Sequence, residues 1–535
     1  GGTTSAPYSS GTENVAIGYQ ALTAFTTGKW NVAVGRNAGD SITTSQGSVL
    51  LGYYAGSQIT TGVGNTIIGE QAGSAHDDSG YNTIIGYRAS ANGTSGGGEY
   101  NVIVGAQAGG QQATMTGGNN SILGYGAMAY ATSTSGNISI GWESGKNLST
   151  GDYNIFMGYS AGGNSTDVDH TVIIGFQAGI SNMTAAADGT IAIGYKSLNA
   201  LTSGTNNTAV GYEALLSEDT GDFNTAIGYQ ALRNQNRDGT VNNTAVGYHA
   251  GLDVTTAYGA TLVGSLAGHN ITEGIENTII GNSAGATLTT GDYNTALGVQ
   301  ALATEDVGRG TTAIGYQALY SQNSDSNDEE TGNVAVGKMA GYSTTTSTQN
   351  ILIGYEAGKV QTTGNKNTLI GYQAGLNNDT GAHNTAIGHE ALEGTSGNSH
   401  SHNTALGVRA LMSISTGGSN VAVGNYAGDA LTTGADNVAI GYTALSTANT
   451  ALSNTAIGVS AMQSIQADQA VSSCVAIGRL ALTGGASTTT GINGTVAIGY
   501  QSLTALTTGA GNTAVGYQAM STADGGEEGN AVFGY

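Results

Sequence analysis

The sequence predicts an all-β fold, a parallel β-solenoid (β-roll) of about 30 short turns, from three observations. A nine-residue phrase, typified by NTAIGYQAL at 224–232, recurs in 30 copies along the 535 residues. In 20 of the 29 intervals its central glycine returns after roughly 17 residues, which is too short for a propeller blade or a leucine-rich repeat. The composition, with 89 Gly and only 9% charged residues, lacks the helix formers that a helical repeat needs.

The nine positions of the phrase each have a physical interpretation. Position 5 is Gly in all 30 copies, which indicates a positive φ or a backbone too crowded for a side chain. Position 4 is always Ile, Val, Leu, Met or Phe, position 3 is usually Ala, and position 8 is Ala or Ser. Side chains alternate along a strand, so positions 2 and 4 form a bulky face and position 3 a small one. We expect the position-5 glycines to lie in a row, among them Gly18, Gly35, Gly52, Gly69, Gly86, Gly228, Gly441 and Gly516.

Position 1 is Asn in 23 of the 30 copies. Turns of a solenoid stack about 4.8 Å apart, so these residues would lie above one another and satisfy one another's amide groups. The predicted asparagine ladder includes Asn14, Asn31, Asn65, Asn82, Asn224, Asn437 and Asn512.

The array is interrupted by no domain boundary. Residues 1–13 read as the end of a preceding repeat, and residues 14–535 as one continuous array whose last copy is truncated. The chain starts without Met and stops in mid-phrase, so we expect it to be a stretch of a longer protein. Extra residues in the longer intervals, as at 322–332 and 463–473, should bulge outward and leave the strand register intact.

Each turn carries more apolar surface than one thin roll can hide. Only one face of a strand can point into the turn, so the other face needs an outside partner. The pattern therefore predicts a chain that is not a monomer. We favour a parallel, in-register homotrimer with its acidic loops outermost.

The phrases Asn14-Val15-Ala16-Ile17-Gly18 and Asn437-Val438-Ala439-Ile440-Gly441 resemble the head repeats of YadA-type trimeric autotransporter adhesins. NTAIGYQAL with its TTG spacer is still more similar to repeats of phage tail-fibre proteins. The resemblance covers almost the whole chain and implies a left-handed parallel β-roll, three chains about one axis and a role in attachment. The adhesin repeat is usually shorter than the repeat of this chain, so loops and interior are expected to differ.

Composition disfavours several function classes. A net charge of −23 argues against binding to nucleic acid or to an anionic membrane. No apolar run approaches the roughly 20 residues of a membrane helix, so membrane insertion is not expected in this segment. No metalloprotease motif, phosphate loop or nucleophile elbow occurs, and Asp and Glu are dispersed. We therefore expect no enzyme activity, catalytic residue or cofactor.

Two candidate metal sites are weaker than their alternatives. His400 and His402 form an H-x-H pair that could hold a metal on a trimer axis, but a solvent-facing loop is the favoured interpretation. The acidic loop at 325–330 could bind Ca²⁺, although it lacks EF-hand spacing and reads as a solvated loop. Cys474 takes the position of an Asn and reads as a buried free thiol, since a single cysteine forms no intrachain disulfide.

Tyr fills position 6 in 16 copies, either as an aromatic stripe for sugars or receptors or, as favoured, as packing between turns. The sequence as a whole predicts a structural, extracellular attachment fibre, most simply the shaft or head of a phage tail fibre that binds a glycan or protein on its host. A bacterial surface adhesin or a secreted filament is the alternative. An ice-binding solenoid is a weaker one, because Thr clusters at turns rather than in T-x-T alternation.

Overall fold

The computed structural model describes residues 10–92, 98–110, 115–326, 330–395, 397, 399–465, 470–484 and 491–535. They form a parallel β-solenoid of about 29 turns, which confirms the predicted fold class. The chain divides into two compact units, the first made of residues 1–266 and 271–273 and the second of 267–270 and 274–535. Residues 1–9, and residues 327–329 of the acidic loop, lie outside the described residues. The described part contains no helix long and apolar enough to cross a bilayer.

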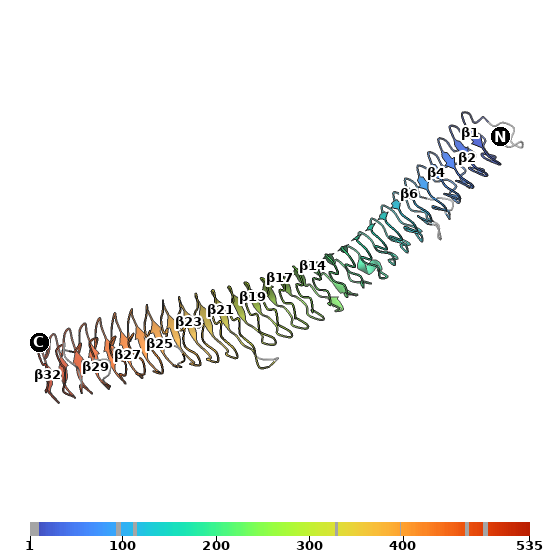
Figure 1. Cartoon of the computed structure of the whole chain (residues 1–535). Helices are drawn as coiled ribbons and strands as arrows, with labels where there is room; N and C mark the ends of the chain where they lie inside the picture. Colours follow the sequence, from blue (N-terminus) through green and yellow to red (C-terminus); the bar gives the residue numbers. More distant parts are fainter. Residues whose placement is uncertain are drawn as a thin grey trace. The chain divides into compact units, whose positions relative to one another are not determined.

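Each turn of the first unit contributes one three-residue strand made of positions 2 to 4 (Figure 1). The ladder strands are β1 (Val15–Ile17), β2 (Val32–Val34), β3 (Val49–Leu51), β4 (Thr66–Ile68), β5 (Thr83–Ile85), β6 (Val102–Val104), β7 (Ser121–Leu123), β8 (Ile138–Ile140), β9 (Ile155–Met157), β10 (Val172–Ile174), β11 (Ile191–Ile193), β12 (Thr208–Val210), β14 (Thr225–Ile227), β16 (Thr244–Val246) and β17 (Thr261–Val263). Long turns add a 3-10 turn, η1 (Ala185–Ala187), and a small pair, β13 (Gly221–Asp222) with β15 (Gly239–Thr240).

The second unit repeats the arrangement. Its strands are β18 (Thr278–Ile280), β19 (Thr295–Leu297), β20 (Thr312–Ile314), β21 (Val334–Val336), β22 (Ile351–Ile353), β23 (Thr368–Ile370), β24 (Thr385–Ile387), β25 (Thr404–Leu406), β26 (Val421–Val423), β27 (Val438–Ile440), β28 (Thr455–Ile457), β29 (Val475–Ile477), β30 (Val496–Ile498), β31 (Thr513–Val515) and β32 (Ala531–Phe533).

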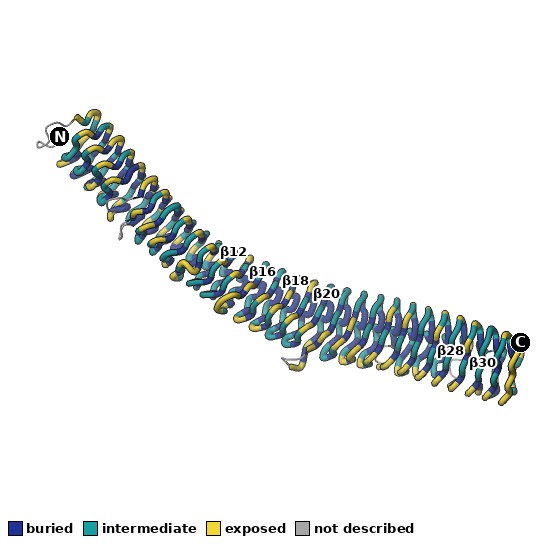
Figure 2. The backbone as a smooth tube through the Cα atoms, turned by 180° about the vertical axis from the view of Figure 1, so that it is seen from behind, coloured by how far each residue is buried: buried dark blue, intermediate teal, exposed yellow. Residues whose placement is uncertain are grey.

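Equal repeat positions pair with one another along the ladder of each unit. In β12 and β14, for example, Thr208 pairs with Thr225 and Val210 with Ile227. Position 3 points into the turn and is buried, while positions 2 and 4 point outward and are partly exposed. In both units, buried segments therefore line the inside of the stacked turns and exposed segments lie at their rims (Figure 2).

The position-5 glycines have both of the properties that the sequence indicated. Gly228 has a φ of +141°, a region that L side chains rarely adopt. A Cβ there would also lie 2.7 Å from the carbonyl carbon of Gly247, the same position of the next turn. Gly371 in the second unit has a φ of +142° and the same close approach to Gly388. Within each unit these glycines stack directly on one another, as expected.

Side chains also occupy left-handed backbone positions, which the sequence did not indicate: positions 7 and 9 of the phrase and the residue before position 1, such as Phe223 with a φ of +60°. Gln230 at position 7 has a φ of +54° and Leu232 at position 9 a φ of +48°. The Gln230 amide donates to the Tyr212 carbonyl in the turn before, and the Leu232 amide donates to the Ala250 carbonyl in the turn after. The corner therefore bonds to both neighbouring turns, and these bonds offset the conformational strain.

The longer turns leave the register intact, as predicted. Across the insertion at 322–332, β20 still pairs with β21, with Thr312 opposite Val334 and Ile314 opposite Val336. The two long turns between β28 and β30 also keep the register, because β28 pairs with β29, and β29 with β30, through equal repeat positions. The strand ladder therefore accepts the longer turns without a shift in register, while residues 327–329, 466–469 and 485–490 of these turns lie outside the described residues.

Candidate interaction surface

The outward strand face exposes apolar side chains in turn after turn of the described chain. Ile227 at position 4 is 40% exposed, whereas Ala226 at position 3 is fully buried. Position 3 therefore faces the interior, where it is Ala in many turns and a buried Ile, Leu or Phe, such as Phe156, in others, and position 4 faces outward. Positions 2 and 4 of successive turns thus form an outward stripe that is apolar at position 4 in every turn and carries Thr, Val or Ile at position 2 of most turns.

Position 6 adds a ladder of aromatic rings beside this stripe. In the first unit eight successive turns carry a ring at this position, and each ring stacks on the next. Centroid separations range from 4.3 Å between Tyr125 and Trp142 to 6.5 Å between Trp142 and Tyr159. The remaining members of the aromatic ladder are Phe176, Tyr195, Tyr212, Tyr229 and Tyr248.

This stacking decides how the rings can contact a ligand. Tyr212 lies 4.8 Å from Tyr195 on one side and 5.0 Å from Tyr229 on the other, with interplanar angles of 9° and 8°. Both ring faces are covered, although the residue is 41% exposed. Sugars stack on aromatic faces, so the interior rings of the ladder offer only edges and hydroxyls. The faces of these interior rings are therefore used in packing between turns. The exposed edges of the rings adjoin the outward strand face.

Threonine also forms in-register rows on the outward face, at position 2. Thr208, Thr225, Thr244 and Thr261 follow one another in β12, β14, β16 and β17. Each is two residues from an outward aliphatic side chain at position 4. No T-x-T alternation occurs in these four strands, because position 4 is Val or Ile in each of them.

The asparagine ladder is largely buried, and most of its members hydrogen-bond through their side chains, although Nδ2 of Asn82 and of Asn224 has no partner among the described residues. The Asn137 Nδ2 donates to Asn120 Oδ1 at 3.1 Å and to the Gly151 carbonyl at 2.9 Å, and its backbone amide donates to the same Asn120 oxygen at 3.0 Å. Asn437 makes the same three bonds in the second unit, to Asn420 and Ala451. One side chain thus links two turns and closes its own, which explains why position 1 favours Asn.

The predicted ladder members follow this pattern of burial. Asn31, Asn65, Asn82, Asn224, Asn437 and Asn512 are buried, and Asn14 in the first described turn is half-buried. Cys474 keeps part of the pattern, because its backbone amide donates to Asn454 Oδ1 at 3.0 Å. Its thiol is buried and free, and burial raises the pKa of that thiol to about 11.

Sequence reasoning missed a buried polar motif at position 12. Glu218 is fully buried, and its carboxylate accepts bonds from the Gly221 amide at 2.6 Å and from Gln235 Nε2 at 2.9 Å. The Gln235 Oε1 accepts in turn from Asn243 of the asparagine ladder at 2.9 Å. Burial raises the pKa of Glu218.

The second unit contains the same motif. Glu305 is fully buried and accepts from the Gly308 amide at 2.7 Å and from Gln322 Nε2 at 2.9 Å, while Gln322 Oε1 accepts from Asn333 at 3.0 Å. In both cases the glutamine lies in a turn longer than the usual period, and the glutamate in the turn before it. Position 12 is apolar in many other turns. A Glu and a Gln at position 12 of two successive turns could therefore have indicated a buried polar pair.

The two buried histidines differ in their hydrogen bonding. His76 bonds Ser79 Oγ through Nδ1 at 2.9 Å and Ser90 Oγ through Nε2 at 2.8 Å. His400 has no hydrogen-bond partner for either ring nitrogen among the described residues. Burial lowers the pKa of each to about 4.

The solvent-facing interpretation of His400 was therefore wrong. His400 is 1% exposed inside its turn, whereas His402 is exposed and stacks on His383 at 5.0 Å. His400 is buried inside the turn and His402 is exposed to solvent, so the two imidazoles of one chain do not converge on one ion. Among the described residues no group of three His, Cys, Asp or Glu side chains could hold a metal.

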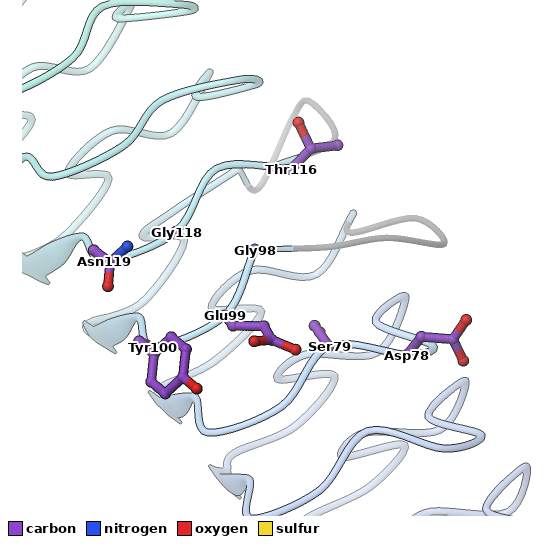
Figure 3. Close-up of a pocket in the computed structure, with 8 residues that line it drawn as sticks. All are labelled: Asp78, Ser79, Gly98, Glu99, Tyr100, Thr116, Gly118 and Asn119. Carbon is purple, nitrogen blue, oxygen red and sulfur yellow. The ribbon is translucent and has the colours of Figure 1, made fainter.

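A polar groove of about 510 Å³ lies where two successive longer turns meet (Figure 3). Glu99 and Asp78 bring carboxylates to it, and Tyr100 brings a ring whose one face stacks on Tyr81 at 5.2 Å. The Asp78 carboxylate accepts from the Thr61 hydroxyl at 2.7 Å, which lowers the pKa of Asp78. The groove is polar, and its carboxylates number too few for a metal site.

Comparison with known proteins leaves the chain without an assigned family. No protein-family model matches it, and no curated protein matches at the threshold of significance. The regular repeat and the β-solenoid therefore carry the functional argument.

Proposed function

We propose that the chain is a structural, non-enzymatic segment of an extracellular attachment fibre, the shaft or head of a phage tail fibre. The observation that carries the proposal is the outward face, which presents the same apolar positions in turn after turn and in register. A surface of constant period suits a partner with the same period. A second and a third copy of this chain have that period.

The proposed assembly is a parallel, in-register homotrimer. Burying even 40 Å² of apolar surface per turn contributes about 1 kcal/mol at 25 cal/mol per Å². Many turns add such contributions along the face, which favours association over a single chain. The net charge of −23 would lie at loops and rims, where water and salt screen it between copies. The long turns then point outward and offer variable loops to a glycan or protein receptor.

The alternative proposal is that the chain belongs to a bacterial surface adhesin or secreted filament, which would use the same face for self-association. Binding of the purified chain to intact candidate host cells, measured by fluorescence, tests the attachment role. Saturable binding that long-loop variants reduce supports it. Absence of binding to every surface tested with an assembled chain contradicts it.

The threonine rows on the outward face favour one weaker candidate, an ice-binding solenoid. Thr208, Thr225, Thr244 and Thr261 lie beside outward aliphatic residues on a regular strand face. This function needs the face to stay uncovered, so it excludes the trimer. Inhibition of ice growth by a monomeric chain would favour it over the fibre.

A further inference from the structure

The outward face is not uniform along the chain. Four successive segments, 138–142, 155–159, 172–176 and 191–195, carry large apolar residues at positions 2, 4 and 6 alike. Elsewhere no two successive segments do so, because Thr, Ser, Ala, Asn or a charged residue occupies at least one of the three positions. We call the outward residues of these four segments the apolar patch.

The geometry of the patch is well defined. It spans β8 to β11, whose pairings place Ile138 beside Ile155, Ile155 beside Val172 and Val172 beside Ile191. Its rings, Trp142, Tyr159, Phe176 and Tyr195, stack face to face and remain 37 to 49% exposed. The strands and the stacking hold the members in place, so little side-chain freedom remains to be lost on binding.

The residues of the patch carry no charge, and the Lys196 ammonium lies at its border, 5.4 Å from the centre of the Tyr195 ring. Its four segments contain no Asp, Glu, Lys or Arg, although the chain as a whole carries −23. The strand ends at position 4 and position 6 follows the glycine corner, so the segment spans at most about 13 Å; four turns stack over about 19 Å, and the patch covers at most about 250 Å². That is about a third of what each partner buries in a stable protein interface, and it has the composition of an interface core.

We infer that the apolar patch is the energetic centre of the contact between copies of this chain. This inference rests on the proposed self-association and assigns its strength to β8–β11. A second copy fits because its own patch has the same strand spacing, the same absence of charge and the same row of ring edges. The adjoining turns extend the contact beyond the patch with weaker, threonine-containing surface. A flat apolar membrane surface matches the chemistry but not the periodicity.

The test uses substitutions that the chain itself tolerates. Asn stands at position 6 in Asn282 and Asn425, so the backbone accepts it there. The patch variant combines Trp142→Asn, Tyr159→Asn, Phe176→Asn and Tyr195→Asn. The matched control combines four ring removals at the same repeat position in the second unit, Tyr355→Asn, Tyr372→Asn, Tyr442→Asn and Tyr500→Asn. Far-UV circular dichroism verifies that both retain the fold.

The readout is subunit exchange between differently labelled chains, together with sedimentation. The patch variant should exchange or dissociate at least about tenfold more readily than the control. If the wild type assembles and the two variants change subunit exchange equally, the inference is overturned. The proposed fibre function would not be contradicted by that result. A monomeric wild type would contradict the self-association itself. If the chain is monomeric and co-floats with phosphatidylcholine vesicles, and the patch variant does not, the surface binds membranes and the inference is overturned too.

Discussion

The two units share a backbone and differ in their surface. In the first unit position 6 carries eight successive stacked rings, from Tyr125 to Tyr248. In the second unit residues such as Val299, Lys338 and Val408 break the row. The glycine corner and the asparagine ladder persist in both. The fold therefore accepts many side chains at position 6, and a concentration of rings there reflects what the surface contacts.

The largest expected effect tests what the units have in common. Gly228→Val and Gly371→Val place a Cβ 2.7 Å from a carbonyl carbon of the next turn at a φ near +140°. Strain and overpacking together should destabilise each unit by about 3 kcal/mol. Hydrogen exchange of the flanking strands measures the local loss of order in each unit.

Gly239→Val is the matched control, because that glycine lies in a long turn and nothing is within 4 Å of a Cβ there. Its positive φ still contributes strain, but no collision. If Gly228→Val cost no more than this control, close stacking of the corners would be ruled out.

The buried histidines distinguish the units. His76→Leu removes two hydrogen bonds and leaves the Ser79 and Ser90 hydroxyls without their imidazole partner, so it should destabilise the first unit by about 2 kcal/mol at pH 7. His400→Leu removes two buried ring nitrogens that have no partner among the described residues, so it should be neutral or stabilising. Urea unfolding of both variants measures the difference, and an equal loss in both would contradict it.

Acid should weaken the wild type through the same two side chains. Their folded pKa of about 4 lies below the unfolded value of 6.5, so the unfolded chain binds more protons between these values. Each buried histidine therefore lowers the free energy of unfolding in acid: the effect is absent above pH 6.5 and grows as the pH falls towards 4. Asp429 acts oppositely, since burial raises its pKa to about 6. The stability difference between wild type and His76→Leu should therefore shrink with falling pH, and a constant difference would refute the assignment.

The carboxylate motif should behave alike in both units. Glu218→Ala and Glu305→Ala each leave buried amide donors unpaired, which should cost about 1–3 kcal/mol. Glu218→Gln retains an acceptor oxygen and should cost less. Limited proteolysis of the adjoining long turns measures the consequence, and faster cleavage is expected only in the alanine variants.

The smallest expected effect concerns a single ring within one chain. Tyr212→Asn removes a ring stacked on both sides, whereas Tyr442→Asn removes one whose only ring contact, with Tyr426, is edge-on at 6.2 Å among the described residues. The first should lower stability by about 1 kcal/mol more than the second. Thermal unfolding measures both, and equal midpoints would indicate that stacking contributes nothing to the fold.

Much of the fold followed from the sequence because the backbone dictates a few positions strictly. The corner occupied by Gly228 has no room for a side chain, and a single Asn side chain at position 1 makes bonds both to the neighbouring turn and to its own. The outward orientation of Ile227 did not follow, because alternation fixes two faces without saying which is inside. The burial of Glu218 and His400 could not be predicted from the sequence either, because isolated polar residues in a repeat are equally compatible with an exposed loop.

The central claim is that a solenoid with a repeating apolar face associates with itself. The native mass of the intact chain, measured by sedimentation equilibrium or native mass spectrometry, tests it most directly. The expected species at micromolar concentration is a homotrimer of three times 53.2 kDa, with no folded single chain. A soluble, folded species of 53.2 kDa would contradict it.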